Sequence, residues 1–518
     1  MRLLAAAAAL ALVGCGVEAP KPWAKMRVVS SEQELRPTDV NSGQQFAFSA
    51  GEIVESYNSL DGGFKVHFTR SGKDAVLAGD ADDSGVPDFV EQVAVVYDDV
   101  DRFYGGMGYR HPLSDQGQTD NGGDGRFDIY LVDFATNADG AFEIDNCVGA
   151  GNTCYGYVSQ ENDFAGYPYP TPVIGTITLG SHEYFHAIQS AYDESQGVVI
   201  QEGTAVLGEE QYDPTLDDFE GFIYGYLKQM DRPLDQPPPG PVPEFAYGSA
   251  IWWRYLTEKF DVATTRKLWE HCVVGAGYPS EPGDLAAPHW MVQQDAMLQT
   301  EYGSSFAQAF REFTVWNLFV GAAADASHYS NGAHYPLPLM TQAPTPYVSP
   351  KLLVFHASAQ YFVTTPGAGM FGAQLASTDP AQTAGLDLLL AVRHAGKITA
   401  TATSADVRAP TMLATAAGDD PIAIVVDAER SGGAYQPHLC LGAASDLAAC
   451  AAANDPDGGV SDAGMPDAGQ PDAGPVDAGI EPSLEIVPLT LGKATGCNAF
   501  GGAPLVFLLL LALRRLRG

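Results

Sequence analysis

Two histidines four residues apart flank a glutamate in the stretch His182–His186, which reads HEYFH. On an α-helix, side chains four residues apart share a face, so both imidazoles can present a nitrogen to one cation. Glu202 follows sixteen residues after the second histidine, in the run QEGTA. Two neutral histidines and one carboxylate are a common ligand set for catalytic zinc, which keeps a fourth position for water. The spacing therefore predicts a Zn²⁺ site formed by His182, His186 and Glu202.

Glu183 is the candidate catalytic base, because the helix carries it beside the two histidines. A carboxylate in this place can accept the proton of an attacking water and later pass it to a leaving amine. Glu209 and Glu210 are alternatives to Glu202 as the third ligand. The small residues of the Gly-Thr-Ala run after Glu202 favour Glu202 as the ligand. They would let its helix lie close to the helix that carries His182 and His186, the metal helix.

The Glu-Gly-x-Ala arrangement at Glu202 resembles the third-ligand helix of gluzincins, the thermolysin-like and aminopeptidase-like zinc peptidases. The interval from His186 to Glu202 is a few residues shorter than in those two types. The metzincin pattern is excluded, because no Gly-x-x-His follows His186. Gluzincin-like peptidases often carry a Tyr-Gly element downstream of the ligand glutamate, and Tyr247 in the run FAYGS matches it. The resemblance implies that Tyr247 donates a hydrogen bond to the oxyanion; a packing role is the alternative.

Residues 80–91 have the spacing of an EF-hand calcium loop, with a glycine at its sixth position. Oxygen-bearing side chains occupy its positions 1, 3, 5, 9 and 12: Asp80, Asp82, Ser84, Asp88 and Glu91. The pattern predicts a Ca²⁺ loop of the kind found in dockerin-like and other extracellular modules, followed by a helix over 90–104. The alternative is a turn that caps this helix.

A second aspartate-rich loop, residues 120–128, reads DNGGDGRFD. Its carboxylates belong to Asp120, Asp124 and Asp128, and Leu131 stands where an EF-hand loop has its last glutamate. The pattern indicates a second, weaker calcium site, which precedes a predicted strand over 129–132.

The cysteines and both ends of the chain indicate export. Cys147 with Cys154 and Cys440 with Cys450 bracket short loops, which predicts two local disulfides. Residues 1–14 have the composition of a signal peptide, and LVGC, which ends at Cys15, resembles a bacterial lipobox. The resemblance implies lipidation of Cys15; cleavage of a plain signal peptide is the alternative.

The remaining terminal segments complete the predicted path to the cell surface. Residues 15–48 are expected to form a tether or pro-segment, and the PDAG-rich stretch 451–492 a disordered linker. Residues 493–518 combine Gly-Cys, an apolar run and an arginine cluster, which resembles the C-terminal sorting tail of exported myxobacterial proteins. A membrane anchor is the alternative for this tail. The protein is thus expected at the outer membrane or cell surface, or secreted, with membrane attachment through either terminus.

The elements around these motifs predict two folded parts. Residues 49–336 are expected to form an α+β zincin-like metalloprotease domain, with a small β-rich N-terminal part and a mainly helical C-terminal part. Residues 351–450 are expected to form a small all-β sandwich. Within the first part, we expect a hairpin over 52–69, a loop-rich stretch over 151–178, and helices over 178–192, 201–211, 216–229, 247–260, 262–274 and 305–319. Within the second, we expect strands over 352–356, 360–364, 387–393, 398–403 and 422–427.

These observations support two hypotheses. The net charge of −37 argues against nucleic-acid partners, because phosphate contacts need Lys and Arg. The motifs are most similar to those of the metalloproteases predicted among exported myxobacterial proteins, a resemblance covering roughly residues 75–260 and the tail. It implies an exported zinc endopeptidase acting on proteins or peptides. The alternative is a surface adhesion or binding protein with an inactive metallopeptidase-like domain, and the presence of Glu183 favours the enzyme.

Overall fold

The computed structural model describes residues 36–38, 46–135, 138–148, 152–216, 218–239, 243–273, 289–364 and 368–454. The predicted signal peptide, Cys15, the tail 493–518, most of the tether and nearly all of the PDAG-rich linker lie outside these residues. Two compact units, Met1–Val460 and Ser461–Gly518, are distinguished, and every described residue belongs to the first. Within the described residues, none of the helices combines the length and apolar character needed to cross a membrane.

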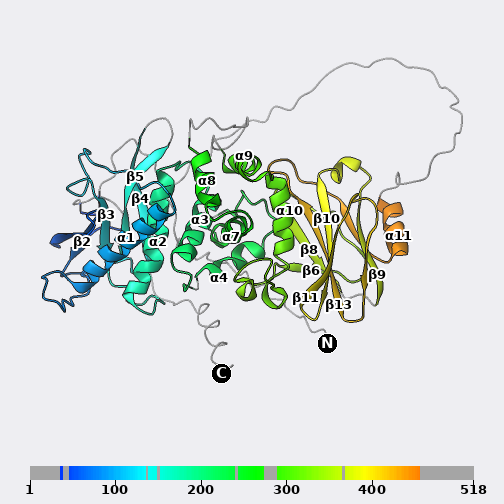
Figure 1. Ribbon diagram of the computed structural model, residues 1–518, viewed down its shortest axis with the longest axis horizontal. Helices are drawn as coiled ribbons and strands as arrows, with labels where there is room; N and C mark the ends of the chain where they lie inside the picture. The colour runs from blue at the N-terminus through cyan, green and yellow to red at the C-terminus, as the bar shows by residue number, and fades with distance from the viewer. Residues whose placement is uncertain are drawn as a thin grey trace, which may run out of the picture. The chain divides into compact units, whose positions relative to one another are not determined.

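The N-terminal part is built on a five-stranded sheet with the order β1-β2-β3-β5-β4 (Figure 1). β1 (Val54–Asn58) and β2 (Phe64–Thr69) form the predicted hairpin. β2, β3 (Phe127–Val132) and β5 (Thr153–Glu161) run parallel, whereas β4 (Gly140–Val148) is antiparallel to β5 and lies at the edge. The sheet therefore ends in an antiparallel edge strand with a neighbouring strand on one side only.

The expectation that residues 151–178 are loop-rich is wrong, because they contain β5 and the first turns of a helix. Strand β5 was difficult to predict because it contains polar residues that do not face solvent: Ser159 and Gln160 are fully buried. The amide of Gln160 accepts a hydrogen bond from the hydroxyl of Tyr97 and donates one to Thr176, which satisfies its buried polar atoms.

Two long helices pack side by side over the sheet: α1 (Asp88–Gly106) and α2 (Pro172–Ser190). α1 confirms the helix predicted after the first aspartate-rich loop and buries an apolar stripe that includes Val93 and Tyr97. α2 begins six residues before the predicted start at Thr178, because the Thr171 side chain accepts a hydrogen bond from the Ile174 N–H and a proline follows it.

The middle of the chain is helical, as predicted, although several boundaries differ. Its elements are α3 (Val198–Tyr212), α4 (Asp218–Phe222), α5 (Tyr224–Leu227), α6 (Glu244–Gly248), α7 (Ala250–Lys259), α8 (Thr264–His271), α9 (Trp290–Tyr302) and α10 (Phe306–Trp316). The helices predicted over 216–229 and 247–260 are each divided in two, and α9 was not predicted. Fully buried aromatic side chains such as Trp252 and Phe313 fill the space between these helices.

The C-terminal part contains two sheets with orders β11-β10-β13-β8-β6 and β12-β9-β14-β7 (Figure 1). The first comprises β6 (Met340–Gln342), β8 (Ser358–Val363), β10 (Leu386–His394), β11 (Lys397–Thr403) and β13 (Asp419–Asp427). The second comprises β7 (Tyr347–Val348), β9 (Gly369–Ala376), β12 (Thr411–Thr415) and β14 (His438–Gly442), and α11 (Ala444–Asn454) follows. The strand predicted over 352–356 is wrong, since Val354 forms only an isolated bridge with Tyr435.

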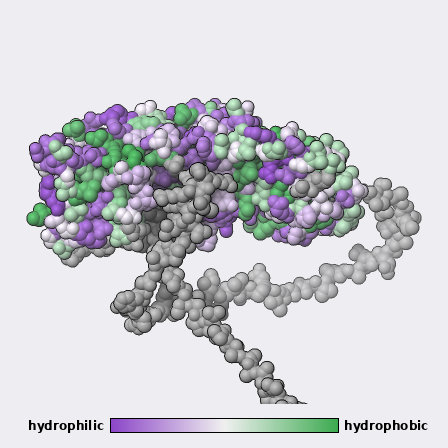
Figure 2. Space-filling model, turned by 90° about the horizontal axis from the view of Figure 1, so that it is seen from below, coloured by the Kyte–Doolittle hydropathy of each residue, from purple (hydrophilic) through white to green (hydrophobic). Residues whose placement is uncertain are grey.

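Apolar side chains from both sheets form one core, to which Phe362, Phe371 and Val425 contribute. Alternate residues of β8 and β13, among them Tyr361 and Ile424, instead join the core of the helical part. On the face shown in Figure 2, hydrophilic side chains are interspersed with smaller hydrophobic groups.

Candidate metal centre

The three predicted zinc ligands converge inside the protein. His182 and His186 project from α2, and Glu202 projects from α3. The two Nε2 atoms lie 3.0 Å apart, and Glu202 Oε2 lies 3.3 Å from His182 Nε2 and 3.4 Å from His186 Nε2. All three side chains are buried. Their ligand atoms are therefore close enough together to hold one metal ion.

Hydrogen bonds at the opposite ring nitrogens determine how the two imidazoles are protonated. His182 Nδ1 donates to the carboxylate of Glu209. His186 Nδ1 lies 2.8 Å from Gln189 Oε1, which can only accept. With these partners, a neutral ring at either position carries its proton on Nδ1 and leaves the Nε2 lone pair for a metal ion. Three electron-pair donors meet at one point, a donor set that fits zinc.

The electrostatics of the site favour positive charge between these atoms. Burial opposes the charged form of His182, but the carboxylates of Glu209 and Glu202 raise its pKa well above the ordinary value. Burial would also raise the pKa of Glu202, but the two histidines hold it below its usual range. Burial raises the pKa of Glu209 to about 7, although His182 lowers it in part. A divalent cation would supply the charge that these carboxylates require.

Glu209 and Glu210 occupy places other than that of a third ligand. Glu209 contacts the far nitrogen of His182 and so orients that ring. Glu210 lies 3.7 Å from Arg254 Nη1 and accepts a hydrogen bond from the Asn331 amide at 3.4 Å. The orienting role of Glu209 was not predicted. Its place seven residues after Glu202, two helical turns along one face, was the available signal.

The Gly-Thr-Ala run after Glu202 contacts α2 through its threonine, at Gln189, whereas its glycine faces α7. A Cβ atom on Gly203 would clash with Ser249 Oγ and Trp253 Nε1, so this glycine permits close contact with α7 and the residue preceding it. Gly208 permits a further close approach to the first two long helices, since a Cβ atom there would lie 2.7 Å from Tyr104 Oη of α1 and 3.2 Å from Phe185 of α2.

Glu183 lies between the metal helix and the edge strand. Its Oε2 accepts a hydrogen bond from the Phe142 N–H of β4 at 2.7 Å, and its side chain is buried. This contact keeps the carboxylate on the side of α2 that faces the edge of the sheet. The carboxylate is therefore adjacent to the histidines and held by a backbone group.

Tyr247 of α6 lies close to the three predicted ligands. Its ring centroid is 5.9 Å from that of His182, and the ring stacks on Phe222 at 5.0 Å. Burial, followed by the charges of Glu202 and Glu183, raises the pKa of Tyr247 well above its usual value. The hydroxyl is therefore protonated at neutral pH and can donate a hydrogen bond.

A further carboxyl–hydroxyl pair near Glu183 was not predicted. The Tyr169 hydroxyl donates to Asp139, which stands directly before β4. Burial raises the pKa of Asp139, with Tyr169 lowering it and Glu183 raising it. The aromatic run GYPYP over residues 166–170 was the available signal in the sequence.

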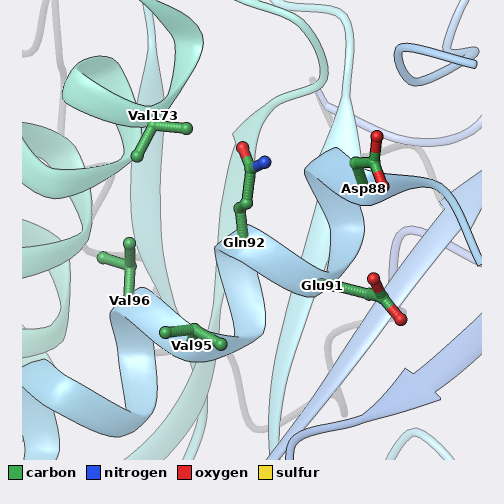
Figure 3. Close-up of a pocket in the computed structure, with 6 residues that line it drawn as sticks. All are labelled: Asp88, Glu91, Gln92, Val95, Val96 and Val173. Atoms are coloured by element: carbon green, nitrogen blue, oxygen red, sulfur yellow. The ribbon is translucent and has the colours of Figure 1, made fainter. Parts of the chain in front are cut away.

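In the loop 80–91, Asp80, Asp82 and Asp88 bring carboxylate oxygens within 4.8 Å of one another. Ser84, also predicted as a ligand, exchanges hydrogen bonds with Val86, and its N–H donates to both Asp80 and Asp82. Glu91 and Asp88 both line a cavity with Gln92, Val95, Val96 and Val173, and their carboxylates point in different directions (Figure 3). The structure thus brings together three of the four predicted carboxylates as a group.

In the loop 120–128, the predicted ligands do not form a similar group within the described residues. Asp124 pairs with Lys65 Nζ and Arg126 Nη1, each at 2.7 Å. Asp128 pairs with Arg36 Nη1 at 2.8 Å and with His67 Nε2 at 2.7 Å. Cationic side chains occupy these carboxylates where calcium was expected.

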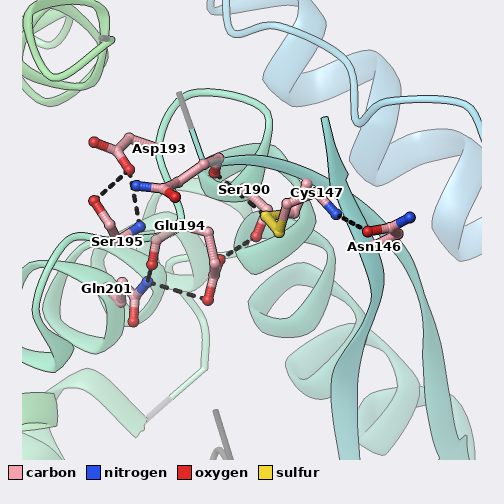
Figure 4. The surroundings of a disulfide bond; sticks show 9 residues. Asn146, Cys147, Ser190, Asp193, Glu194, Ser195 and Gln201 are labelled. Carbon is pink, nitrogen blue, oxygen red and sulfur yellow. Dashed lines mark hydrogen bonds between the residues drawn. A yellow bond between two sulfur atoms is a disulfide. The ribbon is translucent and has the colours of Figure 1, made fainter. Parts of the chain in front are cut away.

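Both predicted disulfides, Cys147–Cys154 and Cys440–Cys450, are formed, and Cys272 is a buried free thiol. The first joins β4 to β5 beside the connection between α2 and α3 (Figure 4). There, Glu194 accepts hydrogen bonds from Ser190 and Gln201, and its N–H donates to Asn152 O at 3.0 Å. The disulfide therefore supports the turn that sets α3 against α2.

Comparisons with known proteins add little to this geometry. No family model matches the chain, and no curated protein matches it. Among solved structures, PliG, a periplasmic inhibitor of g-type lysozyme from Aeromonas hydrophila, is similar over 20% of this chain and 96% of that chain. The sequence identity is 10% and the TM-score is 0.14, a likeness that carries no argument.

Proposed function

We propose that this chain is an exported zinc-dependent endopeptidase with a zincin-like catalytic domain. The observation that carries the proposal is the convergence of His182 Nε2, His186 Nε2 and Glu202 Oε2, with Glu183 held beside them. When bound, zinc supplies polarisation of the scissile carbonyl and a lowered pKa for a coordinated water. A structural zinc site would have no need of a base such as Glu183.

In the proposed mechanism, Glu183 accepts the proton of the attacking water and returns it to the leaving amine nitrogen. The hydrogen bond from Phe142 N–H keeps this carboxylate in place during the transfer. The protonated hydroxyl of Tyr247 donates to the oxyanion as negative charge develops on the carbonyl oxygen. Glu183 and the three predicted ligands are buried, and charges interact more strongly in a low-dielectric interior than in water.

The edge position of β4 supports a polypeptide as the substrate. Among the described strands, β4 pairs with β5 alone, so an extended chain can add along its outward edge beside the Phe142 N–H that donates to Glu183. Phe142, whose N–H reaches Glu183, belongs to this strand. An extended peptide along β4 would therefore pass the proposed catalytic base.

The test compares three forms of the full chain for zinc content and casein cleavage: wild type, Glu183→Gln and Glu210→Gln. We expect the wild type to bind zinc and cleave casein, and Glu183→Gln to keep zinc and lose about 10²- to 10⁴-fold in rate. Glu210→Gln is the matched control: burial raises the pKa of Glu210 to about 7, so an uncharged amide suits its place. Activity of this control should be retained.

Two results would contradict the proposal. A wild-type protein without zinc, or equal cleavage by wild type and Glu183→Gln, would remove the enzyme hypothesis. A protein that binds zinc but cleaves no peptide bond would favour the surface binding protein instead.

We also propose that loop 80–91 binds structural calcium and that Cys15 carries a lipid. The convergence of three carboxylates supports the first. The two disulfides support an oxidising compartment outside the cytoplasm. If Cys15 is lipidated, Cys15→Ser should move the protein from the membrane fraction to the soluble fraction, unless the C-terminal tail anchors it independently.

A further inference from the structure

We infer that Gln189 is a positioning residue of the metal centre, which fixes the protonation of His186 and ties the metal helix to the helix that carries Glu202. The inference rests on the proposed zinc site. Gln189 lies three residues after His186 on the same face of α2, and it is buried. Both ends of its side-chain amide are engaged.

The orientation of the Gln189 amide follows from its partners. Nε2 lies 2.7 Å from the backbone oxygen of Gln201, which can only accept a hydrogen bond. Nε2 therefore donates, and Oε1 must face His186 Nδ1 as an acceptor. The His186 ring consequently carries its proton on Nδ1 and offers the Nε2 lone pair to a metal ion.

Thr204 completes the network on α3. Its hydroxyl donates to Ile200 O at 2.7 Å, so its oxygen is free to accept from Gln189 Nε2 at 2.9 Å. Trp269 Nε1, which can only donate, also reaches Thr204 Oγ1, at 3.2 Å. The two amide hydrogens of Gln189 Nε2 have one acceptor each, and the Thr204 hydroxyl and the Trp269 N–H also have one each, so these hydrogen bonds are mutually consistent.

Gln189 thereby connects two of the three ligands. Gln201 directly precedes Glu202, so the bond to its carbonyl holds the backbone of the carboxylate ligand against α2. On the other histidine, Glu209 of α3 performs the corresponding task at His182 Nδ1. Both histidines of α2 are thus joined to α3 through their Nδ1 atoms, one directly and one through Gln189.

The test measures the zinc affinity of the full chain by competition with a chromophoric chelator. Gln189→Leu keeps the size of the side chain and removes all three hydrogen bonds, and we expect zinc affinity to fall about 10- to 100-fold. Gln294→Leu is the matched control, since Gln294 is a fully buried helical glutamine that accepts from Trp252 Nε1. This control should lose stability while keeping wild-type zinc affinity.

A second variant covers the case in which Gln189→Leu does not fold. Thr204→Val preserves shape but removes one acceptor of the Gln189 amide, and we expect a several-fold loss of zinc affinity. The inference is overturned if wild type binds zinc and Gln189→Leu, or Thr204→Val where the former does not fold, binds it equally well. It is also overturned if Gln294→Leu weakens zinc binding as much as Gln189→Leu. Failure of the proposed function differs, because the wild type itself would then bind no zinc or would cleave no peptide bond.

Discussion

Loops 80–91 and 120–128 both place aspartates at short, glycine-broken intervals, but their carboxylates meet different partners. In the first loop, the carboxylates converge on one another, and their hydrogen bonds come from the N–H groups of the loop itself, such as Ser84 N and Gly85 N. In the second loop, the carboxylates contact side chains from elsewhere in the chain, among them Lys65 and Arg36. The spacing of the aspartates makes the two loops look alike in the sequence. Contacts from residues that are distant in the sequence distinguish them in the structure.

Arg36 is the main source of this difference. Its guanidinium is fully buried, contacts Asp115, Asp128 and Asp145, and lies 4.7 Å from the ring centroid of Tyr157. The charge that a calcium ion would supply to Asp128 is therefore supplied by a side chain. An aspartate-rich loop is therefore a candidate metal site only where no lysine or arginine side chain of the protein pairs with its carboxylates.

The largest expected effect comes from Arg36→Ala. Removal of the guanidinium leaves Asp115, Asp128 and Asp145 without their shared cation, and loss of one partner from a buried ion pair costs about 3–5 kcal/mol. Urea denaturation should show a correspondingly lower free energy of unfolding. Arg102→Ala is the control, because the exposed Arg102 contacts only exposed carboxylates, and its stability should be nearly unchanged. Equal stability of wild type and Arg36→Ala would show that the second loop does not depend on Arg36.

This comparison also shows how far the sequence could predict the structure. Short-range patterns were sufficient for the His182–His186 motif, the β1–β2 hairpin, α1 and both disulfides, because their partners are close in sequence. The environment of Asp128 was not predictable, since Arg36 precedes it by 92 residues and lies in a segment without a secondary-structure pattern. For the same reason, the spacing predicted that Glu202 lies beside the two histidines, but it did not predict the bonds of Glu209 and Gln189, which depend on how α2 packs against α3.

Calcium binding should also distinguish the two loops, through a smaller change in stability than that of Arg36→Ala. Asp82→Asn and Asp124→Asn are matched, since each aspartate accepts a backbone N–H two residues ahead, at 3.0 Å. A ligand present at about 100 times its Kd stabilises by about 2.7 kcal/mol. We expect calcium to raise the Tm of the wild type and of Asp124→Asn, and to have little effect on Asp82→Asn. The opposite pattern would place the calcium site in the second loop.

The Arg36 cluster should also make stability depend on pH. Burial raises the pKa of Asp145 to about 8 and that of Asp115 to about 6, with Arg36 lowering both in part. One guanidinium cannot neutralise three carboxylates. A carboxyl group whose pKa is raised by folding stabilises the protein below its unfolded pKa, and this contribution is lost as pH rises through the folded pKa.

The free energy of unfolding should therefore decline between about pH 4 and pH 8. Asp145→Asn, which stays neutral, should reduce this decline, whereas Asp99→Asn at the exposed Arg102 pair should not. Glu161, whose pKa burial raises to about 7, acts in the same direction, so some decline should remain. A wild type that gains stability over this range would contradict the cluster as described.

The smallest expected effect is that of Glu91→Gln, and it tests how closely the first loop follows the EF-hand pattern. In an EF-hand loop the twelfth residue binds calcium through both carboxylate oxygens, so its loss would be severe. Here Glu91 is outside the group formed by Asp80, Asp82 and Asp88, and it extends away from Asp88 (Figure 3). We therefore expect the calcium Kd, measured by calorimetry, to rise less in Glu91→Gln than in Asp82→Asn. If Glu91→Gln abolishes calcium binding, the loop must rearrange around the ion so that its twelfth residue turns inward, and the carboxylates that converge in this structure would then be only part of the ligand set.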